Sequence, residues 1–385
     1  RFKTKIEPVD ISIDSPPGKP EEDKTPLIYT IGSMMTMATM SASTGVTALN
    51  NVLEGNQDFK DVAPTIISSL AMLSTMMLWP MLSKNYQKRQ AKKNEALRQK
   101  KYTEYVKTKR EEIQTEIKTQ REILIDNYLP LQETRDIIFA KKRNLWEREI
   151  DQSDFLDLRV GIGTTELEGN VSFPQEHFSL TEDNLLSEVY KLGAESRLIE
   201  NVPISLSFVT NNVTAIIGNA ANKQLFINGL VLQMLTYHSY DDLKIVILTN
   251  SKNSQNWDYL KIAPHCWNND KSFRYYATNL DEAKEISLVL EQELQARKYK
   301  DVNGKRELSD VDYKRYKPYY VLITDDYKLV RDVEIVKDVA GLLINVGFSL
   351  IVVSPRLVNI PNECKTFISI GDKKSGIFEN ELVSN

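Results

Sequence analysis

The segment 62–83 reads VAPTIISSLAMLSTMMLWPMLS, contains no charged residue, and is followed at once by the basic run KNYQKRQAKK at 84–93. A second charge-free segment, Thr25–Leu53, comes shortly before it. A helix rises ~1.5 Å per residue, so about 20 residues cross a ~30 Å hydrocarbon core. Each segment is long enough to do so, and we predict a transmembrane hairpin over 26–83, with spans at about 26–49 and 62–83.

The distribution of lysine and arginine predicts the orientation of this hairpin. The segment 84–101 carries many bases and a single acid, Glu95, whereas the loop 50–61 has one base and three acids. Basic residues next to a span favour the cytoplasmic side. We therefore predict a multi-pass protein of the cell membrane. Its N-terminal linker, residues 1–25, and its C-terminal part would both be cytoplasmic.

The first charge-free segment is rich in small residues. Ser33, Met37, Ser41 and Gly45 recur at four-residue spacing. Small residues at this spacing let helices approach closely in lipid. They indicate either packing against the second helix of the same hairpin or contact with another subunit or membrane protein, and the sequence leaves both open.

The next segment, 84–130, is predicted to be a helical stalk. Glycine and proline are absent until Pro130, and good helix formers dominate. A thin apolar stripe includes Val106, Ile113, Ile117 and Leu124. It fits either a coiled-coil seam or a largely solvated single helix. In both cases the stalk would hold the following domain away from the bilayer.

Composition excludes several function classes. The chain has 385 residues and a net charge of −4, which gives nucleic-acid binding no support. Cys266 and Cys364 form no C-x-x-C pair, so a zinc knuckle or a disulfide framework is not expected, and the residues around His265 offer no four-ligand metal site. Because the chain begins at Arg1 rather than at methionine, we interpret it as a fragment of a larger protein.

Residues 131–385 are predicted to form one α/β domain. Asp157–Phe208 indicates a β-rich part with turns at Gly161, Gly163 and Gly169. Alternating strands and helices then predict a parallel sheet covered on both faces. The expected strands are 213–217, 243–248, 273–276, 320–324, 349–353 and 366–370, and the expected helices are 223–237, 280–299 and 334–345.

In such a sheet the first strand–turn–helix is the phosphate position, and here it reads IIGNAANKQL at 216–225. A phosphate loop requires G-x-x-x-x-G-K-[ST]. This turn keeps Gly218 and Lys223, but it is one residue short, lacks the second glycine and has Gln224 in place of the hydroxyl. Asp325 and Asp326 follow a later strand, where a magnesium-binding carboxylate would lie. We interpret these four residues as a vestigial cofactor site, and we expect no catalytic residue and no metal site.

The stretch 144–163, NLWEREIDQSDFLDLRVGIG, resembles the FtsK/SpoIIIE-type ATPases of type VII secretion, the EssC/YukB/EccC group. Further matches are HSYDDL at 238–243, WDYL at 257–260 and APHCW at 263–267, which resemble the first, degenerate ATPase-like domain of the EssC branch of Gram-positive bacteria. The resemblance implies a RecA/FtsK-like pseudo-ATPase fold from about residue 190 onward.

The resemblance also implies a function. The fragment would be the membrane-anchoring and coupling or regulatory part of a type VII secretion motor that exports WXG-type proteins. The parent would be an ATPase that assembles as a hexamer with other secretion components, and its downstream domains, not this fragment, would use ATP and Mg. Two alternatives stay open: a membrane-anchored FtsK-type DNA translocase, or a non-motor membrane scaffold with a binding domain.

Overall fold

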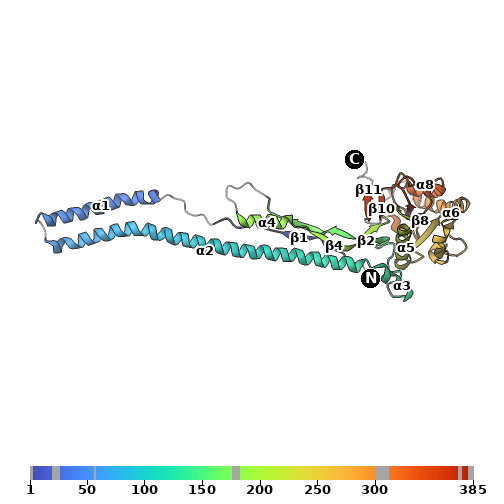
Figure 1. The fold of residues 1–385 in the computed structure, drawn as a ribbon, viewed down its shortest axis with the longest axis horizontal. Coiled ribbons are helices and arrows are strands. Elements are labelled where there is room, and N and C mark those ends of the chain that lie inside the picture. The colour runs from blue at the N-terminus through green and yellow to red at the C-terminus, as the bar shows by residue number, and fades with distance from the viewer. Residues whose placement is uncertain are drawn as a thin grey trace. The chain divides into compact units, whose positions relative to one another are not determined.

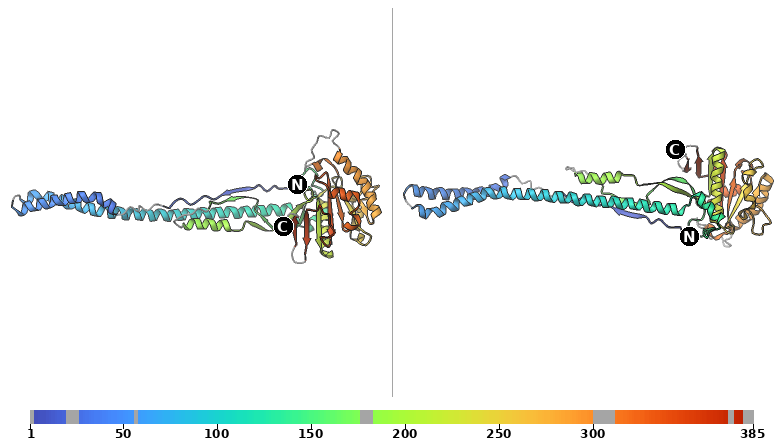
Figure 2. Two further views of the ribbon diagram at one scale, coloured as in Figure 1. Left: turned by 90° about the horizontal axis from the view of Figure 1, so that it is seen from above. Right: turned by 60° about the horizontal axis from the view of Figure 1, so that its bottom comes forward.

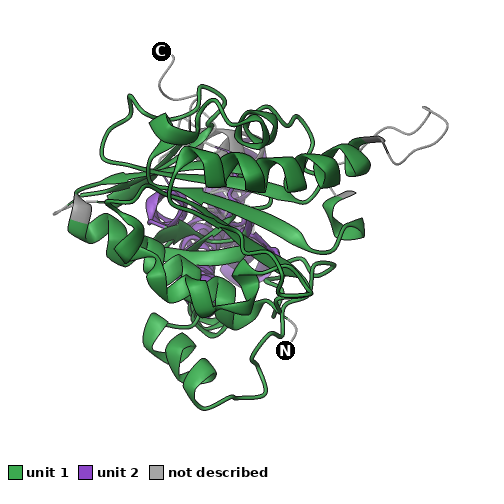
Figure 3. Ribbon diagram, turned by 90° about the vertical axis from the view of Figure 1, so that its right-hand side faces the viewer, with its two compact units in different colours: residues 1–7, 117–168, 197–385 green, residues 8–116, 169–196 purple. Residues whose placement is uncertain are grey.

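The computed structural model describes residues 3–19, 27–55, 58–175, 183–299, 312–371 and 375–379. They divide into two compact units (Figure 3). Unit 1 comprises 1–7, 117–168 and 197–385, and unit 2 comprises 8–116 and 169–196. Residues 169–196 therefore belong to unit 2, although they lie within the predicted domain 131–385.

Two long helices account for most of the N-terminal sequence (Figure 1). Helix α1 covers Leu27–Leu53 and helix α2 covers Phe59–Asn127. The predicted second span and the predicted stalk are thus one continuous helix, with Pro64 and Pro80 inside it. The helix ends just before Pro130, as predicted, and Pro130 is the N-cap of α3, Leu131–Phe139.

The small residues of α1 face α2 in unit 2. The Ser41 hydroxyl lies 3.2 Å from the Met72 sulfur, and a Cβ added to Gly45 would lie 3.2 Å from the Ser69 Cβ. Both views of Figure 2 show the two helices side by side. For Ser41 and Gly45, packing within the hairpin is confirmed, whereas the side chain of Ser33 lies outside the described residues.

One helical segment of the described chain, the one that starts at Phe59, is long and apolar enough to cross a membrane, and 12% of its apolar window is buried. Helix α1 does not meet this criterion, because serine, threonine and glycine dilute its apolar residues. Several of its hydroxyls bond to carbonyls of the preceding turn, as Thr44 does to Met40, so their polarity is satisfied within the helix. Because this criterion considers length and composition alone, both crossings stay predictions.

The rest of unit 2 lies along the part of α2 that belongs to this unit. Strand β1, Val9–Ser12, pairs in parallel with β3, Gly169–Ser172, and helix α4 covers Asn184–Ala194. The Tyr102 hydroxyl donates to the Asp14 carbonyl at 2.5 Å, and Arg110 forms an ion pair with Glu195 at 2.7 Å. Because Val106 is buried, the solvated single helix is wrong for this part of the stalk.

The main sheet of unit 1 has the strand order β11-β10-β5-β9-β8-β6-β7. All neighbours are parallel except the β10–β11 pair. Its strands form because short apolar runs, such as LKIVIL in β6, are buried on both faces. The bounds are β5 Val213–Gly218, β6 Leu243–Leu248, β7 Tyr276–Ala277, β8 Tyr319–Thr324, β9 Phe348–Ser354, β10 Thr366–Ile370 and β11 Ser375–Glu379.

Helices cover both faces of this sheet, as predicted for a parallel-sheet, ATPase-like α/β domain (Figure 3). Side chains of α5, Ala220–Tyr237, and α3 share one apolar core with those of the short 3₁₀ helices η2 and η3. The opposite core contains α6, Leu280–Tyr299, with α7, Tyr327–Val330, and α8, Glu334–Ala340. The 3₁₀ helices are η1 Ser254–Asn256, η2 Asp258–Ile262, η3 Pro264–Cys266 and η4 Asp312–Arg315.

A separate antiparallel ribbon precedes the sheet. It pairs β2, Asp157–Glu166, with β4, Leu198–Ser207. Gly161 and Gly163 lie inside β2, next to shifts in its register, so their assignment to turns is wrong. Glycine is common at such irregularities of a strand, where the backbone bends.

Candidate functional site

The turn between β5 and α5 is closed by its own side chains. The Asn219 side chain caps α5 and accepts a hydrogen bond from the backbone N–H of Asn222 at 3.0 Å. An anion at a helix N-terminus needs such N–H groups to be available. Gly218 has a packing role, because a Cβ there would lie 2.7 Å from the Ile370 carbonyl oxygen in β10.

Lys223 lies in the first turn of α5, close enough to Asp325 for the charge of the carboxylate to act on its ammonium group. Burial lowers the pKa of Lys223, and the Asp325 carboxylate opposes that shift. Within the described residues, its ammonium has no ion pair or hydrogen bond. Gln224, in the position where a phosphate loop carries its hydroxyl, donates to the Asn228 side chain at 3.0 Å.

Asp325 follows β8 and has both carboxylate oxygens engaged. One accepts a hydrogen bond from the Thr249 hydroxyl at 2.7 Å and the other from the Trp257 indole at 2.9 Å. Trp257 is fully buried. The indole and the hydroxyl therefore hold this carboxylate at the carboxyl edge of the sheet.

Asp326 serves as the N-cap of α7. Its side chain accepts hydrogen bonds from the Leu329 backbone N–H at 3.4 Å and from the Asn250 amide at 2.8 Å. The structure thus brings Lys223 and Asp325 to one edge of the sheet, as the sequence suggested, but the carboxylates there are occupied by protein donors. Each of these carboxylate oxygens accepts one hydrogen bond and keeps a second lone pair, so the vestigial character of the site stays a prediction.

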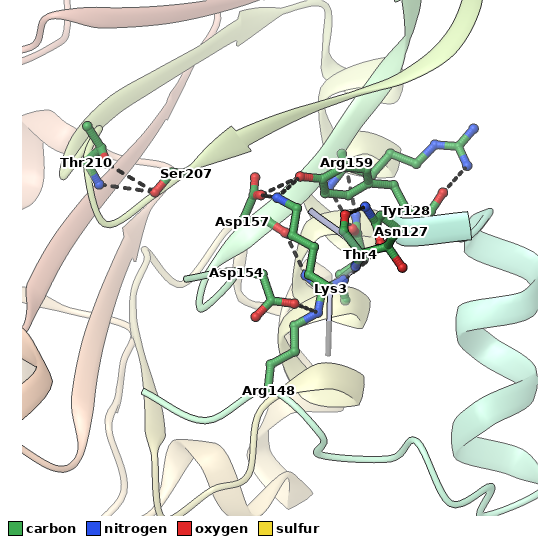
Figure 4. A network of polar contacts seen from close by, with 11 residues as sticks. Lys3, Thr4, Asn127, Tyr128, Arg148, Asp154, Asp157, Arg159, Ser207 and Thr210 are labelled. Carbon is green, nitrogen blue, oxygen red and sulfur yellow. Dashed lines mark hydrogen bonds and ion pairs between the residues drawn. The ribbon is translucent and has the colours of Figure 1, made fainter. Parts of the chain in front are cut away.

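A denser polar cluster lies at the opposite end of α5, where the motif 144–163 meets the end of α2 (Figure 4). The Arg148 guanidinium donates to the Asp157 carbonyl at 2.8 Å and to the Asn127 carbonyl at 3.3 Å. It also forms an ion pair with Asp154 at 3.4 Å and stacks on the Tyr237 ring at 4.1 Å. Arg148 is buried, and five donors in a planar fork suit such multiple contacts.

Arg159 makes a second connection between the same helices. Its guanidinium donates to the Tyr128 carbonyl at 3.1 Å. Its backbone N–H donates to the Gln233 side chain, and the Gln233 amide donates back to the Arg159 carbonyl, each at 2.9 Å. Gln233 lies in the last part of α5, so Arg159 joins α5 to the C-terminal end of α2.

The N-terminal segment of unit 1 adds to this cluster. Lys3 donates to the Asp157 carboxylate at 2.6 Å and to the Tyr128 hydroxyl, which also donates to Asp157. Thr4 and Asn127 exchange two hydrogen bonds, at 3.0 and 2.8 Å. Burial raises the pKa of Tyr128, so the hydroxyl keeps its proton as a donor at neutral pH.

Trp146 and Arg148 bind the last carbonyls of α5 through their backbones. The Trp146 N–H donates to the Thr236 carbonyl at 2.8 Å, and the Arg148 N–H donates to the Tyr237 carbonyl at 2.9 Å. The carbonyl ends of helices carry partial negative charge, which cations stabilise. We call the set Arg148, Arg159, Asp154 and Asp157, with the carbonyls of Asn127 and Tyr128, the helix joint.

The motif that contains the helix joint can be recognised in the sequence, but the sequence predicted no role for its residues. The available signal was two arginines placed around an acidic pair, about 20 residues after a long helix. That pattern indicates cations near a helix C-terminus, but it does not say which helix end they reach.

Two buried histidines lie beside the helix joint. His238 Nδ1 lies 3.1 Å from the Arg148 carbonyl, and His265 Nε2 lies 2.9 Å from the His238 carbonyl. Burial lowers the pKa of His238 to about 3 and that of His265 to about 4. Both rings are neutral at pH 7 and connect the segment around η3 to the motif.

Comparison with known proteins confirms the predicted resemblance. The chain is 22% identical over 312 residues to the ESX secretion system protein EccC of Geobacillus thermodenitrificans, and 24% identical over 325 residues to the type VII secretion system protein EssC of Staphylococcus aureus. These matches cover 81% and 83% of the chain and 20% and 21% of the relatives. The chain therefore corresponds to about a fifth of their length. No family model matches the chain.

Solved structures give weaker likenesses. The cytoplasmic domain of EccC from Thermomonospora curvata aligns with 46% of the chain, and the chain covers 21% of it, at a TM-score of 0.35 and 15% identity. EssC (ATPases 2 and 3) from Geobacillus thermodenitrificans aligns with 60% of the chain, covered to 40%, at a TM-score of 0.32 and 15% identity.

Proposed function

Because the homologues of this chain are the type VII secretion proteins EccC and EssC, we propose that it is the membrane-anchoring and coupling part of a type VII secretion motor. In this proposal the α1–α2 hairpin crosses the cytoplasmic membrane twice. Helix α2 then continues to the ATPase-like domain, which passes conformational changes between the bilayer and the ATPase domains of the whole protein.

The helix joint is the observation that carries this proposal. A passive spacer needs no more than a flexible connection between helix and domain. Here two arginines bind the last carbonyls of α2, and the same motif binds the last carbonyls of α5. The guanidinium bonds are charge-assisted and partly buried, and together with the backbone bonds they give a stiff connection. A rotation or tilt at the end of α2 would therefore move α5 with it.

The occupied phosphate position supports a regulatory rather than a catalytic role. Phosphoryl transfer depends on positioned phosphates and a metal that neutralises charge. In this domain the Asp325 carboxylate accepts hydrogen bonds from the Thr249 hydroxyl and the Trp257 indole. We propose that Gly218, Lys223, Asp325 and Asp326 are vestigial and that ATP and Mg act in further domains of the parent.

The cargo and the assembly follow from the same family relationship. We propose that the motor exports small helical WXG-type proteins, works as a hexamer and contacts other membrane components of the secretion system. We do not propose nucleic acid as a partner. Binding to its phosphates depends on a basic protein surface, and the net charge of this chain is −4.

Labelling in intact cells tests the two crossings. Asp58, in the loop between α1 and α2, is changed to cysteine and treated with a thiol reagent that does not cross membranes. We expect labelling from outside, while a cysteine at Gln99 in α2 is labelled after lysis. Labelling of both positions only after lysis would contradict the hairpin.

An export assay tests coupling. In the parent protein, Arg148→Ala combined with Arg159→Ala is expected to abolish export of WXG-type proteins while the protein stays in the membrane fraction. Arg143→Ala is the matched control, because Arg143 is an exposed arginine of the same segment. Normal export by the double variant, present at the wild-type amount, would rule out the coupling role.

A further inference from the structure

Five bases follow the apolar part of α2 directly: Lys84, Lys88, Arg89, Lys92 and Lys93, which we call the basic collar. All five are exposed, and within the described residues none has an acidic partner. Some bases farther along the helix do have one, as Arg98 has Asp183 and Arg110 has Glu195, whereas Lys100 and Lys118 have none within the described residues. The collar is thus a dense group of uncompensated bases that lies directly beside the apolar part of α2.

We propose that the basic collar binds the headgroups of anionic phospholipids. This inference depends on the proposed insertion of the apolar part of α2 into the bilayer. If the hydrocarbon core ends near Ser83, the collar extends ~14 Å beyond it, at ~1.5 Å per residue. A headgroup layer of roughly 6 Å and a Debye length of about 8 Å together cover that distance. Every base of the collar then lies within the field of the lipid surface.

The side chains around the collar favour lipid over a protein partner. At 3.6 residues per turn, Lys84, Lys88 and Lys92 lie on one side of the helix, whereas Arg89 and Lys93 continue round toward the other. The five charges thus spread over about half of the circumference. Apart from Tyr86 and Ala91, residues 84–93 are all polar, so they offer no apolar stripe for another helix to cover.

Two aromatic residues fix the depth of the collar. Trp79 is 64% exposed and Tyr86 is 66% exposed, and seven-residue spacing places them on one face of α2. Aromatic side chains of this type settle at the membrane–water interface. Leu82, between them on the same face, is also exposed. Trp79 and Tyr86 lie on either side of Ser83, where the apolar part of α2 ends and the basic collar begins, as expected for residues at the boundary of a bilayer leaflet.

Lipid retention tests the proposal on the full chain. The protein is extracted in mild detergent with equal amounts of phosphatidylglycerol and phosphatidylcholine, and bound lipid is measured by native mass spectrometry. The wild-type chain is expected to retain phosphatidylglycerol with roughly tenfold preference, because each base near an anionic surface adds to the attraction. Changing all five collar bases to glutamine is expected to remove that preference.

The control carries the same change of charge farther from the apolar segment: Lys100, Lys101, Lys107, Lys118 and Arg121 are changed to glutamine. It should retain phosphatidylglycerol as the wild type does. Equal preference in wild type and collar variant would overturn the proposal, as would collar-dependent binding of a short DNA duplex without lipid preference. Carbonate extraction of membranes reports separately on insertion: release of the wild-type chain would refute the membrane role itself.

Discussion

The two ends of α5 differ in what their polar residues do. At its N-terminal end, where a nucleotide would be bound, Asn219 caps the helix and the Asp325 carboxylate is bound by Thr249 and Trp257. At its C-terminal end, Arg148 and Arg159 bind the carbonyls that end α2. At one end the cap and the carboxylate are bound by neighbouring protein groups, while the other end has charged groups that hold two helices together. This difference is what we expect if the domain transmits position rather than hydrolyses ATP, as proposed.

Removing Arg148 should have the largest effect on stability. Arg148→Ala leaves the buried Asp154 carboxylate without its cation and two carbonyls without their donor. Breaking a buried pair in this way costs about 3–5 kcal/mol. Chemical denaturation of the full chain in detergent measures it, and Arg143→Ala should change stability by less than ~0.5 kcal/mol. Equal stability of the two variants would remove the helix joint from the account.

Acid should weaken the same end of the domain. The pKa values of His238 and His265, about 3 and about 4, lie below the ordinary value of 6.5, so the unfolded chain binds more protons below pH 6.5. The contribution of the two neutral rings to the free energy of unfolding is fully present above pH 6.5 and is lost as the pH falls. From pH 7 to pH 5 the free energy of unfolding should decrease by about 4 kcal/mol.

The control for this pH dependence is a variant with both His238→Asn and His265→Asn. It removes the two titrating groups, so its free energy of unfolding should vary much less between pH 7 and pH 5. A wild-type protein whose stability is flat over that interval would show that these rings are not held neutral by burial.

At the other end of α5, Trp257→Phe tests whether Asp325 is held by structure. The indole hydrogen bond is lost and one carboxylate oxygen loses its donor, which should cost about 2 kcal/mol. Trp267→Phe is the matched substitution, because that indole donates to a backbone carbonyl and is only partly buried. A cost for Trp257→Phe no greater than for Trp267→Phe would mean that the Asp325 contact contributes little.

The smallest effect is expected for Lys223→Ala. Within the described residues the Lys223 ammonium has no hydrogen bond or ion pair, so its removal should change the free energy of unfolding by less than ~0.5 kcal/mol. A loss of 2 kcal/mol or more in chemical denaturation would show that the lysine does stabilise the carboxyl edge of the sheet.

Local patterns allowed much of the fold to be predicted from the sequence. The strands β6 and β10 and the helix α6 have the predicted bounds, since each is a short apolar run or an amphipathic period set off by turn residues. The predicted helix 334–345 ends at Ala340, because Gly341 follows as its C-cap. Gly341 is a stop signal that the sequence contains, so the predicted helix extends too far beyond it.

Long-range contacts were not predictable in the same way. Strand β1 pairs with β3, whose residues lie 160 positions later, and no periodicity in either strand indicates the other. The helix joint depends on the approach of two helix ends, which the sequence of the motif does not specify. At the phosphate position, Gly218 and Lys223 could be identified from the sequence. The hydrogen bond from Trp257 to Asp325 could not, because these residues come together only in the folded domain.

Calorimetric titration of the full chain with Mg·ATP tests the central claim, that this domain couples without binding nucleotide. With Asn219 capping α5 and Asp325 engaged, we expect no measurable heat of binding at micromolar nucleotide. Micromolar binding that is lost in Lys223→Ala would contradict the account.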